Sequence, residues 1–215
     1  MIKYMPYRPG LRVLDCRCGK GILLDQLDGR TGAAWGIDHS LSALGGGDAL
    51  MPQQVAAAQA TMLPFAPAAF DVVFGDRTLR RTEDPTQVLR EMARVLRPGG
   101  HLIMWEPRHL LRRTPMTELG RRMRAAGLVP VCAEGFGFVV YPMSLAISML
   151  PLLSRSYLAH TLIKALLAVD GLLGRLSALD GKSWHLIIVA EKRTEKPDAR
   201  PCRHPDFSKD KPYGR

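Results

Sequence analysis

The chain has 215 residues, of which 47% are hydrophobic and 23% are charged, so its length and composition fit one α/β domain with its own core. The formal net charge is +10, but a mildly basic surface attracts anions of any kind, so charge alone does not indicate a nucleic-acid partner. The first ten residues lack the apolar stretch of a secretion signal, and no His and Cys residues have zinc-ligand spacing. We therefore expect a cytoplasmic protein without a metal site.

Apolar runs alternate with helical segments through the first half of the chain. The expected elements are strands at 11–15 and 33–38 with a helical stretch at 21–27 between them, a weaker strand at 53–58 and a strand at 70–74. Strands that alternate with helices predict a mostly parallel sheet with helices on both faces.

A longer helix is expected after the strand at 70–74. It begins at Asp84 and Pro85, because a capping acid followed by proline is typical of a helix start. Its apolar stripe reaches Leu96, and Pro98-Gly99-Gly100 is expected to stop it before a further strand at 101–105.

The pattern changes in the last third of the chain. Residues 135–154 carry no charge, a long helix is expected at 157–178, and a final strand at 183–192. We therefore predict one domain over residues 1–193, with a helical insert at 139–182 before the last strand. Residues 194–215 are polar and rich in proline, which predicts a disordered tail.

The loop after the first strand has the composition of a ligand-binding turn. Val13-Leu14-Asp15 is followed by Cys16-Arg17-Cys18-Gly19-Lys20-Gly21 and then by the helical stretch. Glycines in such a loop let the backbone approach a ligand closely. Asp38 ends the second strand, where an acid can accept hydrogen bonds from both hydroxyl groups of a ribose. A tight turn without a ligand is the alternative for the loop taken alone.

A set of motifs in order is more specific than the loop. Val-Leu-Asp-x-x-Cys-Gly-x-Gly is followed by Gly-Ile-Asp, by Leu-Pro-Phe at 63–65, by Phe-Asp-Val-Val at 70–73 and by Arg-Val-Leu-Arg-Pro-Gly-Gly-His-Leu at 94–102. This order resembles the class I S-adenosylmethionine (AdoMet)-dependent methyltransferases, especially the branch that includes the ubiquinone and menaquinone C-methyltransferases. The resemblance implies a Rossmann-like, mostly parallel sheet of seven strands with the last strand antiparallel.

The resemblance also implies AdoMet as the cofactor and assigns roles by position. Asp15 and Gly19 are expected along the methionine end, Gly21 closes the loop, Asp38 holds the ribose, and Gln59 replaces the acid on the adenine side. The residues expected to line the cofactor are Asp15, Arg17, Cys18, Gly19, Gly21, Asp38, Gln59 and Gly75.

Two departures from the family pattern concern the site. Arg17 stands where the first glycine of Asp-x-Gly-Cys-Gly-x-Gly is usual, so its side chain either meets the ligand or turns outward. After the fourth strand the chain has Gly75-Asp76-Arg77-Thr78, and not the Asn/Asp/Ser-Pro-Pro-aromatic motif of nucleic-acid amino-methyltransferases. A nucleic-acid acceptor is therefore not expected.

No general base is identified by the sequence. The candidates are Asp76, His109 and His160, and an ion pair of Asp76 with Arg77 or Arg80 is an alternative role for that acid. Glu106 and Tyr141 also lie in segments that can face the acceptor, although a surface position is the default interpretation of Glu106 and His109.

The function that follows is methyl transfer from AdoMet to a small, apolar or amphipathic acceptor. The insert at 139–182 has three interpretations: a lid over the acceptor, a homodimer or peripheral membrane contact, or ordinary packing. A catalytically silent AdoMet-fold domain that serves as a binding or scaffold protein is the main alternative. A nicotinamide-binding protein is disfavoured, because the loop lacks GxGxxG spacing.

Overall fold

The computed structural model describes all residues except 7, 41–53, 109–114, 137–168, 170–182 and 195–215. The predicted insert at 139–182 (apart from Val169) and the predicted tail beyond Thr194 therefore lie outside the described residues. In the described part of the chain, no helix is both long and apolar enough to cross a membrane.

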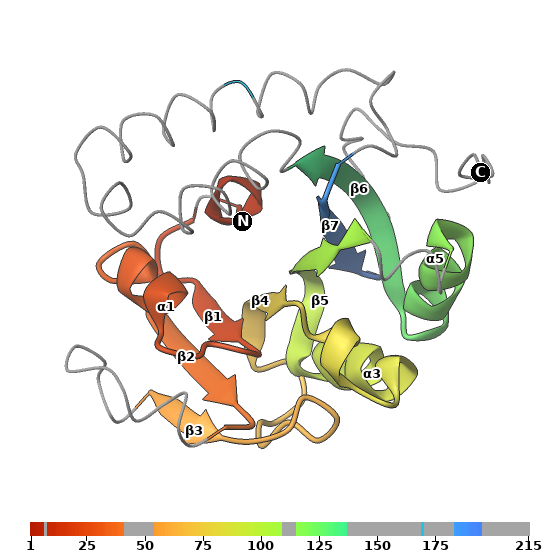
Figure 1. Cartoon of the computed structure of the whole chain (residues 1–215). Coiled ribbons are helices and arrows are strands. Elements are labelled where there is room, and N and C mark those ends of the chain that lie inside the picture. Colours follow the sequence, from red (N-terminus) through yellow and green to blue (C-terminus); the bar gives the residue numbers. More distant parts are fainter. Residues whose placement is uncertain (7, 41–53, 109–114, 137–168, 170–182, 195–215) are drawn as a thin grey trace.

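The described elements alternate as the sequence predicts (Figure 1). In chain order they are η1 (Ile2–Tyr4), β1 (Arg12–Asp15), α1 (Ile22–Leu27), β2 (Ala33–Asp38), β3 (Val55–Ala57), β4 (Phe70–Asp76), η2 (Leu79–Arg81), α3 (Pro85–Val95), β5 (Leu96–Pro107), α5 (Met116–Ala125), β6 (Leu128–Phe136) and β7 (His185–Lys192). Helix α5 was not predicted from the sequence.

The strands form one seven-stranded sheet in the order β3-β2-β1-β4-β5-β7-β6. Strands β1 to β5 run parallel to one another, whereas β7 runs antiparallel to both β5 and β6. The predicted Rossmann-like α/β class, with a mostly parallel sheet and an antiparallel last strand, is confirmed. The strand order reverses its direction between β1 and β4, and in open α/β sheets ligands bind outside the carboxyl ends of the strands at such a point.

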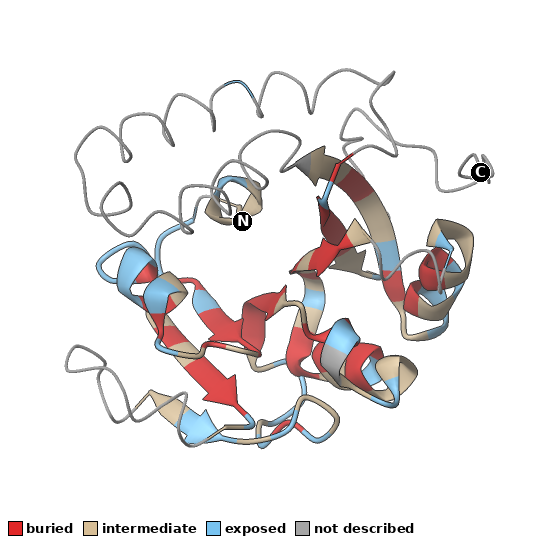
Figure 2. Ribbon diagram, in the orientation of Figure 1, coloured by how far each residue is buried: buried red, intermediate tan, exposed pale blue. Residues whose placement is uncertain are grey.

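Buried residues run along the central strands of the sheet (Figure 2). Successive residues of a strand point to opposite faces, and both faces are packed in a hydrophobic cluster. On β7, for example, Leu186 and Ile188 belong to one hydrophobic cluster and Ile187 and Val189 to the other. Helices α3 and α5 cover the first face, and α1 covers the second together with the N-terminal segment. This two-sided burial fixes the register of the strands, because a slip of one residue would exchange the two faces.

Helix α3 begins as predicted and ends earlier. The carboxylate of Asp84 accepts a hydrogen bond from the Gln87 N–H at 2.9 Å, and Pro85 occupies the first turn. The helix ends at Val95, because Leu96 is already extended and pairs with Phe70. The Pro98-Gly99-Gly100 segment, expected to be a turn, lies inside β5. The pairing of β5 with β4 is irregular there, before it becomes regular at His101. The preference of the residue before a proline for extended backbone is consistent with this early end.

Candidate functional site

Four acidic residues lie at the carboxyl ends of four adjacent strands. Asp15 ends β1, Asp38 ends β2, Asp76 ends β4, and Glu106 is the penultimate residue of β5. Because these strands are neighbours and parallel, their carboxyl ends lie along one edge of the sheet. The sequence analysis expected Asp76 and Glu106 in the segments that follow their strands. In the structure both residues lie within the strands themselves.

The glycine loop between β1 and α1 is held from both sides at this edge. The Cys16 N–H donates to the Phe74 carbonyl on β4 at 2.9 Å, and the Cys18 N–H donates to the Ile37 carbonyl on β2 at 3.0 Å. Gly19 has a φ of +50° and Gly21 a φ of +75°, which L side chains rarely adopt. The glycines therefore allow the loop to turn back along the strand ends.

Cys18 packs inward and does not face a ligand. A Cβ atom added to Gly36 on β2 would lie 2.6 Å from the Cys18 Sγ and 2.7 Å from its Cβ, so the loop lies directly against the backbone of β2. Burial raises the pKa of the Cys18 thiol to about 12, and the negative charges of Asp15 and Asp38 act in the same direction. The thiol stays protonated, and Cys18 can offer a ligand only its backbone.

Asp38 fixes the loop to the end of β2. Its Oδ2 accepts the Gly19 N–H at 3.1 Å, and its Oδ1 accepts the Ser40 N–H at 3.0 Å and lies 3.2 Å from the His39 Nδ1. A carboxylate has about four acceptor positions, so Asp38 retains acceptor capacity beyond these contacts. The residue predicted to hold a ribose therefore also positions the loop beside it.

Asp15 is buried and holds its proton more tightly than an ordinary aspartate. Burial is the main reason that its pKa rises to about 7, and the negative charges of Asp76 and Asp38 add to the rise. The Arg17 N–H, which donates to Oδ1 at 3.1 Å, and the Arg17 guanidinium oppose it. A buried carboxyl group with a pKa near neutrality at a strand end is typical of a binding or catalytic site.

The Arg17 side chain reaches across the point where the strand order reverses. Its Nη1 donates to the Asp76 carbonyl on β4 at 3.1 Å. Its Nε is buried and has no hydrogen-bond partner among the described residues. Of the two possibilities that the sequence left open, the outward orientation is therefore not observed, and the guanidinium lies along the site edge from β1 to β4.

Asp76 is paired, as one of the two sequence interpretations expected. The Arg77 Nε and Nη2 donate to its two carboxylate oxygens at 3.1 and 3.3 Å. Arg77 also lies over the Trp105 ring at 5.5 Å, and its φ of +49° is unusual for a residue with a side chain. The other base candidates, His109 and His160, and Tyr141 lie outside the described residues.

Two cofactor candidates lie further along the edge. Gln59 follows β3, is exposed, and accepts the Met62 N–H through its backbone carbonyl at 3.0 Å. Gly75 precedes Asp76, and a Cβ there would come within 3.1 Å of the Thr78 Oγ1 and 3.2 Å of the Met92 Cε. Gly75 therefore permits close packing under the loop after β4, and it does not open toward the edge.

Glu106 is the site residue that sequence reasoning placed wrongly at the surface. Its side chain is fully buried, and Oε1 accepts the Leu79 N–H at 2.9 Å. Burial raises the pKa of Glu106 to about 8, and the negative charge of Asp76 acts in the same direction. Only the alternation of β5 could have indicated its burial, since Leu102 and Met104 share its parity and are buried.

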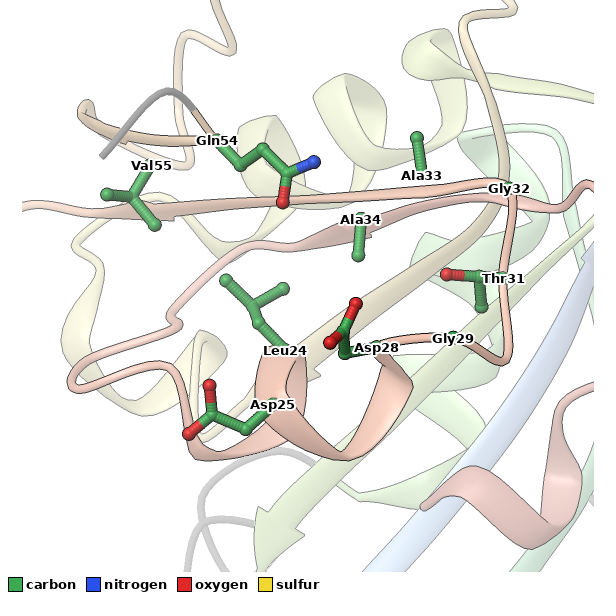
Figure 3. A pocket seen from close by; sticks show the side chains of 10 residues that line it. All are labelled: Leu24, Asp25, Asp28, Gly29, Thr31, Gly32, Ala33, Ala34, Gln54 and Val55. Carbon is green, nitrogen blue, oxygen red and sulfur yellow. The ribbon is translucent and has the colours of Figure 1, made fainter. Parts of the chain in front are cut away.

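A cavity of about 220 Å³ lies away from this edge (Figure 3). It is formed by α1, the turn that follows it, the beginning of β2 and the residues around Val55, with Asp25 and Asp28 contributing carboxylates. None of the predicted cofactor residues lines it. The acid-lined strand ends, and not this cavity, bring the candidate residues together.

The comparisons with known proteins agree with the motifs. A family model described as a methyltransferase domain matches residues 14–104. The demethylmenaquinone methyltransferase of Mycolicibacterium paratuberculosis is 41% identical over 100 residues, which are 46% of this chain and 42% of that protein. The ubiquinone/menaquinone biosynthesis C-methyltransferase UbiE of Laribacter hongkongensis is 40% identical over 107 residues, 46% of this chain and 44% of that protein. The matches span less than half the length of these relatives.

Solved structures share the fold at low sequence identity. The [4+2]-cyclase SpnF has a TM-score of 0.60 and 21% identity, and the match covers 89% of this chain and 78% of SpnF. Phosphoethanolamine N-methyltransferase 2 of Haemonchus contortus, solved with AdoMet, has a TM-score of 0.62 and 17% identity over 89% of this chain and 51% of that protein. The resemblance to the class I methyltransferases of the ubiquinone and menaquinone type is confirmed.

The first prediction concerns the packing of the loop against β2. Gly36→Ala should lower the free energy of unfolding by about 1–3 kcal/mol, because the new methyl group meets Cys18 and the Leu24 Cδ1 below 3 Å. Urea denaturation measures this loss. Adding Cys18→Gly to the alanine variant should restore part of the stability, and a Gly36→Ala protein as stable as the unchanged chain would contradict the contact.

The second prediction follows from the pKa of Asp15. Between pH of about 4 and 7 the unfolded carboxyl group ionises while the folded one keeps its proton, so this group lowers the free energy of unfolding as pH rises. Asp15→Asn should remove that fall and gain stability relative to the unchanged chain at pH 7.5 but not at pH 4. Urea denaturation at both pH values, with the exposed Asp25→Asn as the control, tests this. A difference independent of pH would show that Asp15 ionises normally.

Proposed function

Because the chain carries a class I AdoMet-dependent methyltransferase domain similar to the quinone C-methyltransferases, we propose that it transfers a methyl group from AdoMet to a small, apolar or amphipathic acceptor. AdoMet supplies an electrophilic methyl group on a sulfonium. The observation that carries the proposal is the Gly19 N–H bond to the Asp38 carboxylate, because the glycine loop and the acid proposed to bind the ribose are thereby adjacent at the carboxyl edge of the sheet.

The residues at this edge fit the cofactor. Asp38 has acceptor positions left for the ribose hydroxyls, and the backbone at Gly19 has open space where a side chain would stand. Asp15 supplies a buried carboxyl group at the end of β1 for the methionine part. Arg17 is the exception, because its guanidinium occupies the edge between β1 and β4.

The acceptor is proposed to lie toward β4 and β5. Apart from Gly75 on β4, the residues assigned to the cofactor lie at or after the ends of β1, β2 and β3. The remaining part of the edge is formed by the ends of β4 and β5 with Asp76, Arg77 and Glu106. Methyl transfer is an in-line displacement, so positioning of the two reactants accounts for much of the rate. The insert at 139–182 is proposed to cover an apolar acceptor.

A catalytically silent domain with this fold is the competing function. The fold alone does not decide between them, since SpnF is named as a cyclase and shares it. Calorimetric titration of the protein with AdoMet and with S-adenosylhomocysteine tests the proposal. Binding of both in the micromolar range is expected, and absence of binding would overturn it.

The third prediction assigns the ribose to Asp38. Asp38→Ala should weaken AdoMet binding by about 1–3 kcal/mol, roughly 5- to 150-fold, through the loss of charge-assisted hydrogen bonds. Asp38→Asn keeps an acceptor for the Gly19 N–H and should still lose most of this affinity. Calorimetry measures both, with His39→Gln as the control that leaves the carboxylate in place. An Asn variant that binds AdoMet normally would restrict Asp38 to holding the loop.

The fourth prediction concerns Arg17. Arg17→Gly should tighten AdoMet binding several-fold, because it frees the edge between β1 and β4 and restores the glycine of the family pattern. Arg17→Lys retains a long cationic side chain and should bind like the unchanged protein. Weaker binding by the glycine variant would instead make Arg17 a ligand contact. Equilibrium dialysis with radiolabelled AdoMet gives both dissociation constants.

A further inference from the structure

A second cavity, of about 390 Å³, lies at the amino ends of the central strands. The starts of β1, β4 and β5 contribute to its lining, together with the turn that precedes β1. The charged residues of the lining are Arg8, Arg12, Asp71 and Arg97, so positive charge is in excess. Because these strands are parallel, the cavity lies at the opposite edge of the sheet from the acidic strand ends.

Asp71, the acid of the Phe-Asp-Val-Val motif, organises this cavity. Its side chain is buried, its Oδ2 accepts the Arg12 N–H at 2.7 Å, and its Oδ1 pairs with the Arg97 Nη1. A buried carboxylate requires such partners. One acid on β4 thus joins the start of β1 to the start of β5 and holds the Arg97 guanidinium beside the cavity.

The single acid offsets only part of the positive charge. A guanidinium has five N–H donors, and Arg97 contacts Asp71 through Nη1, so other donors remain for a ligand. Arg8 is exposed, and its guanidinium has no hydrogen bond or ion pair with the residues that the structure describes. The Arg12 guanidinium lies over the Trp35 ring at 5.8 Å and has no ion pair within the same residues. Two positive charges of the lining are therefore left without an acid.

The charges of Arg8 and Arg97 act on the same neighbouring side chain, His101 on β5. Burial is the main reason that the pKa of the His101 imidazole is lowered, the negative charge of Glu191 opposes this, and the positive charges of Arg8 and Arg97 add to it. Glu191 is opposite His101 on β7 and does not line the cavity. Both arginines therefore lie near His101, which can report on any charge that binds between them.

We propose that this cavity binds the phosphate group of a small soluble molecule, with Arg8 and Arg97 donating to the phosphate oxygens. A phosphate monoester carries about two negative charges at neutral pH and has three strong acceptor oxygens. It therefore matches the unpaired charge of the lining, and the fork of a guanidinium fits two of its oxygens at once. A carboxylate, with one charge and two oxygens, matches less well.

The volume of the cavity favours a phosphate ester over a bare ion. Sites for small molecules typically have volumes of roughly 300–1,000 Å³, and this cavity lies within that range. Small residues form part of its wall, and a Cβ atom at Gly10 would meet nothing within 4 Å. The organic part of the ligand thus has room beside the phosphate. The inference goes beyond the proposed methyl transfer and does not depend on it, because the proposed cofactor site is at the other edge.

The test is a titration of the full chain with inorganic phosphate, without AdoMet and at constant ionic strength, followed by NMR of the histidine side chains. The His101 signals should shift and saturate, and the pKa of His101 should rise by about 0.5, because the bound anion offsets the charges of Arg8 and Arg97. The signals of His39, at the carboxyl edge, should not move. Absence of saturation, or an unmoved His101, would overturn the inference.

Arg8→Gln is the variant that removes a phosphate contact without removing the partner of Asp71. It should weaken phosphate binding by about 5- to 10-fold, and Arg8→Lys, which keeps the charge but loses the fork, by only about 2-fold. Arg124→Gln is the matched control, because Arg124 on α5 is also exposed and has no ion pair among the described residues. An equal loss of affinity in Arg8→Gln and Arg124→Gln would overturn the site and leave only the effect of net charge.

Two further probes separate the ligand classes. Acetate at the same ionic strength should bind at least about 5-fold more weakly than phosphate, and equal affinities would overturn the assignment to phosphate. Phenyl phosphate should bind at least as tightly as inorganic phosphate, and its exclusion would overturn the assignment to an ester.

A lipid headgroup is the other source of phosphate, and vesicles test it. Vesicles of phosphatidylglycerol and phosphatidylcholine in equal parts should not sediment the protein through Arg8, because a headgroup in a bilayer cannot enter the cavity with its glycerol part. Vesicle binding that is lost in Arg8→Gln, without saturable binding of inorganic phosphate, would overturn the inference in favour of a membrane surface.

Discussion

The site depends on the crowding of four carboxyl groups along one edge of a buried parallel sheet. Asp15 and Glu106 are buried there, and their pKa values are raised first by burial and further by the negative charge of Asp76, whose strand lies between theirs. The chain offsets this repulsion locally, with backbone N–H groups on Asp15, Asp38 and Glu106 and with the Arg77 guanidinium on Asp76. Carboxyl groups that would destabilise a hydrophobic core are thus retained at the edge where the ligand is proposed to bind.

The buried strands that form this edge were the most predictable part of the fold. The strands around Val13, Ile37, Val73 and Ile188 carry apolar runs that end in an acid or a turn, and such runs identify buried strands. Helix α5 was missed because its buried face is narrow, with Leu119 and Met123, beside arginines that resemble a solvated run. The seven-stranded sheet with an antiparallel last strand was predicted from the family resemblance and not from periodicity, and the order of the strands comes from the structure.

Side-chain roles at the site were harder to predict because they depend on single turns of the backbone. Whether Asp76 is a free base or an ion pair depends on the left-handed turn at Arg77, which no sequence pattern announces. The burial of Glu106 depends on the same turn, since the loop that follows folds over it. Arg17 could be named as a departure, but only the structure shows it reaching the Asp76 carbonyl.

The charge of the proposed cofactor and the protonation of the carboxyl groups at this edge affect each other. AdoMet carries a positive sulfonium, and the thioether left after transfer is neutral, so an edge rich in carboxylates favours the reactant over the product. Asp15 and Glu106, with pKa values of about 7 and 8, are partly protonated near neutral pH and lose protons more readily when a cation approaches. Arg17 already supplies a fixed positive charge to this edge and takes part of that role. In the proposed cofactor site, an arginine in place of the family's glycine therefore changes the local charge as well as the free space, and both changes act against a cationic ligand.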